Sequence, residues 1–133
     1  GASEIKYNIE TMDRKVFERV CLGKSYDFLM ESLKEAVPQF GKNRVFTNFL
    51  VGLGESDDTV EEGVKTLCEM GVIPIVRPVK PNPLQGRDLY LEQASASRLM
   101  KLRRILKDVV EEFGLNPESA KTMCLPCRGC DLR

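Results

Sequence analysis

Three segments of the chain show the hydrophobic patterns of β-strands. Residues 4–12, EIKYNIETM, place apolar side chains at alternate positions, which predicts a strand with one apolar face. Residues 44–52, RVFTNFLVG, are apolar enough to predict a buried strand of a parallel sheet. Residues 72–79, VIPIVRPV, predict a third strand, and Pro74 places it at a sheet edge or a bulge.

Apolar residues at helical spacing follow each predicted strand. The pattern predicts helices over residues 25–41, 56–71 and about 97–113, with serine or aspartate near the start of the first two and glycine at or just after the end of each. Residues 13–25 have the composition of a polar connector. The positions expected to face inward on the three helices are Phe28, Leu29, Leu33, Val37 and Phe40; Val60, Val64, Leu67 and Cys68; and Leu99, Leu102, Leu106, Val109 and Phe113.

Strands and helices that alternate in this order form crossovers around a parallel sheet, so the predicted fold class is α/β. Three strands can neither close an eight-stranded barrel nor hide both sheet edges. The chain is therefore either a small open domain or a piece of a larger fold, and we favour the piece. Residues 1–3 look like a remnant of tag removal, residues 4–115 form the βαβαβα unit, and residues 116–133 form a cysteine-bearing tail. We expect the core to end at about Leu115.

Composition removes several classes of function. The 133 residues carry 20 Lys and Arg against 20 Asp and Glu, so nothing favours nucleic acid or an anionic membrane as a partner. No apolar run approaches the roughly 20 residues that a membrane helix needs. Histidine is absent, which removes the commonest general base, and any zinc site would need thiolate or carboxylate ligands. Five cysteines without secretory features favour a reducing, cytoplasmic compartment.

A glycine-rich turn, GLGES, joins the second strand to the second helix. Ligands of parallel sheets bind beyond the carboxyl ends of the strands, where glycine allows close backbone approach and a helix offers free N–H groups. The alternative interpretation is a tight turn in which Glu55 caps the helix. The polar residues expected at this edge would suit a zwitterionic, ribose-bearing small molecule; they are Asn8, Glu10 and Thr11, Gly52, Gly54 and Glu55, and Arg77.

Three motifs occur in the order and approximate spacing of a known family. YNIETMDRKVF resembles a strand with the pattern HNxDT, with Tyr7 in place of the histidine and Glu10 in place of the aspartate. FLVGLGES resembles a glycine-rich segment with the pattern IxGxGE, and VIPIVRPVKPNPL resembles the strand that follows it. Together they resemble the later barrel strands of biotin synthase-like radical S-adenosylmethionine enzymes, over about residues 4–86.

This resemblance implies a TIM-like partial (β/α) barrel, with its fourth to sixth units present here. It implies that Asn8 and Glu10 hydrogen-bond the amino-acid and ribose parts of S-adenosylmethionine, that residues 51–54 lie near the adenine, that Glu55 fixes the turn and that Arg77 reaches into the cavity. Glu10 is one methylene longer than the usual aspartate, which would shift its partner. The family's CxxxCxxC loop, which holds the iron–sulfur cluster, is absent from these 133 residues, so the chain alone is expected to be inactive.

The end of the chain, TMCLPCRGCDLR, places Cys124, Cys127 and Cys130 in a CxxCxxC pattern. Two intervening residues permit a tight turn between thiolate ligands, so the pattern favours a metal or iron–sulfur site over three incidental thiols. A fourth ligand is not evident, because Cys68 is expected in the core, whereas Cys21 lies in the connector and could move. The resemblance favours an iron–sulfur cluster, and zinc is the alternative.

Two hypotheses follow. The first is the C-terminal part of a radical S-adenosylmethionine, biotin synthase-related enzyme that acts on a small molecule. The second is a free-standing α/β binding module that carries cysteine-ligated zinc. In either case three strands leave open edges and an apolar surface bearing some of Val45, Phe49, Val51, Ile73 and Ile75, so we expect a homodimer that pairs strand edges.

Overall fold

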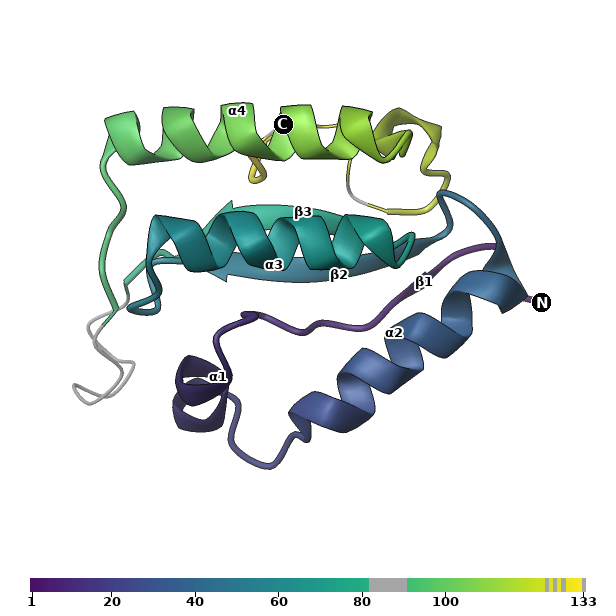
Figure 1. Ribbon diagram of the computed structural model, residues 1–133, viewed down its shortest axis with the longest axis horizontal. Helices are drawn as coiled ribbons and strands as arrows, with labels where there is room; N and C mark the ends of the chain where they lie inside the picture. Colours follow the sequence, from purple (N-terminus) through teal and green to yellow (C-terminus); the bar gives the residue numbers. More distant parts are fainter. Residues whose placement is uncertain (82–90, 124, 126, 128, 133) are drawn as a thin grey trace.

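The computed structural model describes residues 1–81, 91–123, 125, 127 and 129–132 (Figure 1). These residues form a parallel sheet in the order β1-β2-β3, with β1 at Ile5–Lys6, β2 at Val45–Val51 and β3 at Ile73–Pro78. The helices are α1 (Arg14–Val20), α2 (Tyr26–Phe40), α3 (Asp57–Glu69) and α4 (Ala96–Glu112), and a 3₁₀ turn at Pro117–Ser119 follows α4. The predicted α/β class and parallel sheet are confirmed.

Serine residues cap the three longer helices. The side chains of Ser25, Ser56 and Ser95 accept hydrogen bonds from the backbone N–H three residues later, which satisfies one donor in each first turn. Gly71 and Gly114 have φ values of 86° and 63° just after α3 and α4, in the left-handed region where glycine has no steric cost. No helix in the described part of the chain combines the length and apolar character needed to cross a lipid bilayer.

The first strand is shorter than the pattern predicted. The Ile9 backbone N–H donates to Thr47 Oγ1 at 2.9 Å, so a side chain replaces a strand carbonyl as its acceptor. One residue later, Glu10 pairs with Phe49 in an isolated bridge, and its φ is 64°. The regular ladder therefore stops after Lys6 although the chain continues alongside β2.

The predicted polar connector contains a helix, α1, so that part of the prediction is wrong. Asp13 begins it by accepting a hydrogen bond from the Val16 backbone N–H at 3.0 Å. Val16 and Phe17 are buried on its inner side. Seven residues are too few to show a helical hydrophobic pattern. The only local sign of this helix in the sequence was therefore Asp13, a residue type that often caps helices.

The predicted inward faces of the helices are confirmed on α3 and α4 and wrong at one position of α2. Phe28 is 69% exposed, whereas Leu33 and Ala36 carry the buried contacts of α2. The other expected residues of α2 pack against the core from its margin. Pro74 lies in an edge strand, as predicted, since β3 ends the sheet formed by the described residues.

The sheet side chains expected to form an exposed apolar surface are buried, so this expectation is wrong. Val45, Phe49, Val51, Ile73 and Ile75 are each at most 2% exposed. Phe49 lies on the same sheet face as α3, because a Cβ added at Gly63 of α3 would meet its ring at 2.9 Å.

The C-terminal tail belongs to the core, contrary to the expectation that the core ends at about Leu115. Leu125 is 1% exposed and Leu132 is 9% exposed, and both join the main hydrophobic cluster. The Leu132 backbone N–H donates to the Val76 carbonyl at 3.0 Å, so the tail reaches the edge of β3 that faces away from β2. In Figure 1 the yellow tail passes behind α4, whereas α3 lies in front of β2 and β3. An exposed strand edge leaves backbone N–H and C=O groups unpaired, and the tail covers part of that edge of β3.

Candidate functional site

The carboxyl end of the first strand carries a glutamate in an uncommon backbone conformation. Glu10 has a φ of 64°, its N–H donates to the Asn48 carbonyl at 3.0 Å, and its carbonyl accepts from the Leu50 N–H at 2.7 Å. A left-handed conformation in a non-glycine residue costs about 1 kcal/mol or more, and such residues cluster at binding sites. The hydrogen bonds to β2 on both sides hold Glu10 in this conformation.

The Glu10 side chain lies in a partly buried, cationic environment. It is 18% exposed, and its carboxylate lies 3.8 Å from Lys24 Nζ. Burial raises the pKa of the carboxyl, and the positive charges of Lys24, Lys6 and Arg77 oppose that shift in part. A carboxylate with so little solvent and one long ion pair can still accept hydrogen bonds from a bound molecule.

Three buried polar atoms close to this edge have no hydrogen-bond partner within the described residues. They are Asn8 Oδ1, Asn48 Oδ1 and Arg77 Nε. Asn48 and Arg77 lie on the same sheet face, because Leu50, two residues after Asn48, pairs with Arg77 in the register of β2 and β3. Buried polar atoms are nearly always hydrogen-bonded, so these two acceptors and one donor need partners that ordered water or a bound polar molecule could supply.

Thr11 is fully buried beside this group and takes part in the following turn. Its Oγ1 accepts from the Asp13 backbone N–H at 3.2 Å, and its own N–H donates to the Ile9 carbonyl at 2.8 Å. These bonds lead the chain from the first strand into α1. Thr11 therefore shapes the turn next to Glu10.

The glycine-rich turn is held from inside by Glu55. The buried carboxylate accepts from the Gly52 N–H at 2.8 Å and from the Leu53 N–H at 2.7 Å, and Arg98 Nη2 lies 3.0 Å from Oε1. The cap of α3 is Ser56, so the alternative in which Glu55 caps the helix is wrong. Two N–H groups that could have faced a ligand are thus used by the turn itself.

Each glycine of the turn accommodates another part of the chain. A Cβ at Gly52, where φ is 107°, would lie 2.2 Å from the Glu92 carbonyl oxygen. A Cβ at Gly54, where φ is 103°, would lie 3.1 Å from the Arg19 guanidinium, which also donates to the Leu53 carbonyl. The close approach that glycine permits here is therefore to residues 19 and 92.

Ion pairs fasten the turn to the start of α4. Arg98 Nε donates to Asp57 Oδ1 at 2.7 Å, and Lys101 Nζ lies 3.0 Å from Asp57 Oδ2. Hydrogen bonds from Arg98 and Lys101 lower the pKa of the Asp57 carboxyl. Together with the ion pair between Glu55 and Arg98, these bonds hold the turn after β2 in a fixed position against α4.

The predicted cysteine site is described only in part. Cys124 lies outside the described residues, and Cys127 and Cys130 are exposed. Among the residues that the structure describes, no group of three His, Cys, Asp or Glu side chains is arranged to hold a metal ion. Cys21 and Cys68 are buried away from water, and burial raises the pKa of the Cys68 thiol to about 12. Cys68 is therefore a core residue as predicted, and Cys21 is packed in the core rather than free to move.

Sequence reasoning missed two residues of the candidate site. Asn48 interrupts the apolar run of β2, and its polarity within a buried strand was the signal that could have identified it. Lys24 follows α1 and pairs with Glu10, and no pattern in the sequence indicates that a residue 14 positions away would lie there.

Comparison with known proteins points to one kind of relative. No protein-family model matches the chain. Two biotin synthases of Clostridium botulinum, from the strains Hall and Langeland, are each 27% identical to it over 113 residues. The matched region is 82% of this chain and 35% of each relative, so the chain spans about a third of their length. Identity this low suggests a relationship to biotin synthases at most.

Proposed function

We propose that the chain is part of a biotin synthase-related radical S-adenosylmethionine enzyme and forms one wall of its S-adenosylmethionine site. The observation that carries the proposal is the group of polar atoms without partners at the carboxyl edge of the sheet, Asn8 Oδ1, Asn48 Oδ1 and Arg77 Nε, beside the strained Glu10. The similarity to biotin synthases supports it, as do the order and spacing of the three strand motifs. On this proposal the βα units belong to a TIM-like partial barrel that other residues of a longer protein complete.

The chemistry of the ligand matches the groups at this edge. S-adenosylmethionine carries a ribose diol and an ammonium group that donate hydrogen bonds, which the Glu10 carboxylate and the amide oxygens of Asn8 and Asn48 accept. Its carboxylate accepts a hydrogen bond from Arg77. The Gly52 and Leu53 N–H groups already donate to Glu55. On this proposal the turn therefore contacts the adenine through its surface shape and its carbonyl groups and not through those two donors.

The chain's own contribution is to bind and orient. An iron–sulfur cluster, when bound, supplies the electron that cleaves S-adenosylmethionine, and the CxxxCxxC sequence that would hold it is absent here. The residues of this chain hold the ribose and amino-acid parts in place, and burial of Glu10 excludes water from one side of the ligand. Positioning of this kind lowers a barrier by fixing the geometry in advance.

The tail supplies a second part of the proposal, an auxiliary metal or cluster site at Cys124, Cys127 and Cys130. The Gly129 backbone N–H donates to Cys127 Sγ at 3.5 Å, and backbone donors of this kind also surround the sulfurs of iron–sulfur clusters. Leu125 and Leu132 are buried in the core, and the exposed Cys127 and Cys130 lie between them in the sequence. Anaerobic reconstitution with iron and sulfide should give absorbance at about 400 nm, and replacing all three cysteines by serine should abolish it. One zinc per purified chain would instead favour the alternative metal.

A second candidate is the free-standing α/β module with cysteine-ligated zinc. The observation that favours it is the tail on β3, where the Leu132 N–H reaches the Val76 carbonyl and helps to cover an edge that a larger barrel would pair with its next strand. A homodimer would then use the edge of β1. Sedimentation at micromolar concentration tests the dimer, and a monomer would contradict it.

Binding of S-adenosylmethionine by the isolated chain tests the main proposal. Calorimetry should give a dissociation constant above about 0.1 mM, because the cluster that chelates the amino acid is missing. Asn8→Ala, Asn48→Ala and Glu10→Gln should each weaken binding, and Lys34→Ala, an exposed change on α2, should leave it unchanged. Micromolar binding that all three changes leave intact would show that the site is elsewhere.

A further inference from the structure

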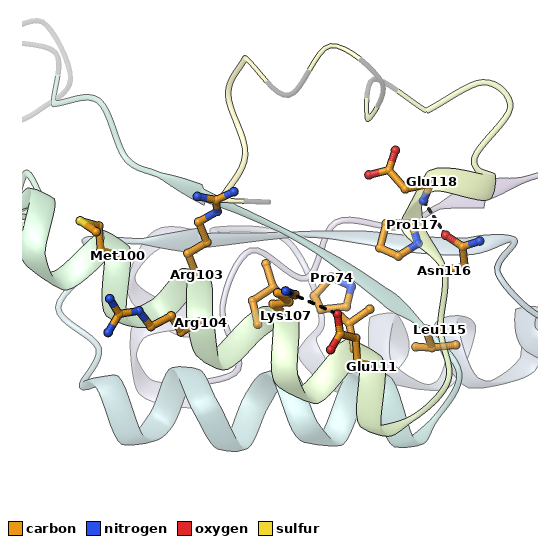
Figure 2. A pocket seen from close by; sticks show the side chains of 12 residues that line it. Pro74, Met100, Arg103, Arg104, Lys107, Glu111, Leu115, Asn116, Pro117 and Glu118 are labelled. Atoms are coloured by element: carbon orange, nitrogen blue, oxygen red, sulfur yellow. Dashed lines mark hydrogen bonds and ion pairs between the residues drawn. The ribbon is translucent and has the colours of Figure 1, made fainter.

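A groove of about 540 Å³ lies between α4 and the segment that follows it (Figure 2). Its apolar floor comes from Pro74 of β3, Leu106 and Val110 of α4, and Leu115 beyond the helix. Three of these side chains are at most 8% exposed, so the groove is recessed rather than a flat apolar surface. Pockets that hold small organic molecules have volumes of about 300–1,000 Å³ and mostly apolar walls.

This groove is separate from the candidate site at the carboxyl edge. Pro74 is the second residue of β3, whereas Arg77 lies near the other end of the strand. Neighbouring residues of a strand point to opposite faces, so Pro74 faces away from the side that carries Ile73, Ile75 and Arg77. No residue of the S-adenosylmethionine proposal lines the groove.

Cationic side chains lie along one wall of the groove. Arg103 and Lys107 are one helical turn apart on α4, and both are exposed. None of the ion pairs between described residues includes Arg103. In Figure 2 its side chain rises toward the C-terminal tail. Lys107 lies 3.8 Å from Glu111 in a pair that is mostly exposed, and the groove's other carboxylate is Glu118. A surface pair of this kind contributes little and can be exchanged for a bound anion.

We propose that the groove binds a linear amphiphilic carboxylate, a medium-chain fatty acid in chemical terms. The carboxylate lies between Arg103 and Lys107, and the alkyl chain covers Pro74, Leu106, Val110 and Leu115. The guanidinium of Arg103 suits a carboxylate because its two parallel N–H donors match the two oxygens. The recessed floor suits a single chain, whereas a lipid surface requires apolar groups that protrude.

Titration of the whole chain with decanoate, followed by amide chemical shifts, tests this site. We expect saturation with a dissociation constant of about 0.1–1 mM and shifts along residues 102–118. Decyltrimethylammonium, which carries the opposite charge on the same chain, should bind at least about tenfold more weakly. Replacing Arg103 and Lys107 together by glutamine should weaken decanoate by about tenfold or more.

The matched control replaces two cations far from the groove, Lys15 and Lys34, by glutamine, and decanoate binding should stay unchanged. Thermal melting of both double variants shows whether each is folded. Equal affinity for the cationic amphiphile, equal affinity of the Arg103 and Lys107 double variant, or no saturation below about 5 mM would overturn the proposal. Association with anionic vesicles in the absence of binding to monomeric decanoate would also overturn it, in favour of a membrane surface.

Discussion

Replacing Glu4 by glutamine should lower the free energy of unfolding by about 3 kcal/mol at pH 7. The fully buried carboxylate accepts from the backbone N–H groups of Lys121 (2.6 Å) and Thr122 (2.8 Å), from Thr122 Oγ1 (2.7 Å) and from Arg44 (3.0 Å). Burial raises its pKa, but the hydrogen bonds from Thr122, Lys121 and Arg44 outweigh burial and lower the pKa from 4.5 to about 2. That difference corresponds to about 3 kcal/mol. In the variant an amide N–H would face a donor in place of one oxygen.

The pH dependence separates this account from a simple packing defect. Because the folded-state pKa is lower than the unfolded one, the stabilisation is complete above about pH 5 and is lost as the pH falls toward 2. Urea unfolding should therefore give a difference between wild type and Glu4→Gln of about 3 kcal/mol at pH 7 and less than about half of that at pH 3. Glu31→Gln, an exposed change on α2, should alter neither value. A difference below about 0.5 kcal/mol at pH 7, or the same difference at both pH values, would refute the reasoning.

Three further changes test other parts of the structure. Gly52→Ala should lower the free energy of unfolding in urea by more than about 3 kcal/mol, because its Cβ would lie 2.2 Å from a backbone oxygen. Gly23→Ala, at φ 79° with open space around it, should lower it by about 1 kcal/mol, and equal losses in the two variants would contradict this. Glu10→Gly should raise the free energy of unfolding by about 0.5–1 kcal/mol, because glycine adopts the left-handed conformation without strain, and it should weaken the binding of S-adenosylmethionine. A variant that loses both stability and binding would show that Glu10 is not strained. Iodoacetamide at pH 8 should alkylate the exposed Cys127 at least about a hundredfold faster than Cys68, whose buried thiol has a pKa of about 12. Mass spectrometry of the peptides measures both rates, and similar rates would contradict the protection of Cys68 by burial.

The order of strands and helices could be predicted because each pattern was local. Apolar runs indicate β2 and β3, and helical spacing with a following glycine indicates α3 and α4, without reference to the rest of the chain. The shortened β1 could not be predicted, because it depends on Thr47 Oγ1 replacing a backbone acceptor 38 residues away. Burial of the tail could not be predicted either, because it depends on two contacts between distant parts of the chain. Leu132 donates to the Val76 carbonyl, and Thr122 donates to Glu4.

The candidate site was predictable in its position more than in its details. Strand order alone places Asn8, Glu10 and Arg77 at one edge of a parallel sheet. The sequence could not reveal that Glu55 would use the N–H groups of the turn, because that depends on how its side chain folds back. That Asn48 Oδ1 has no hydrogen-bond partner among the described residues is likewise a property of three-dimensional packing and not of any motif.

A map of the amide groups that respond to S-adenosylmethionine tests directly whether the carboxyl edge of the sheet binds it. In a ¹H–¹⁵N titration of the isolated chain to about 5 mM ligand, we expect fast-exchange shifts at the carboxyl ends of the strands, at residues 8–11, 48–54 and 76–79, with little change along residues 102–118. The shifts should shrink in Asn48→Ala and persist in Lys34→Ala. Shifts confined to the groove beside α4, or a spectrum that S-adenosylmethionine leaves unchanged at that concentration, would contradict binding at the carboxyl edge of the sheet.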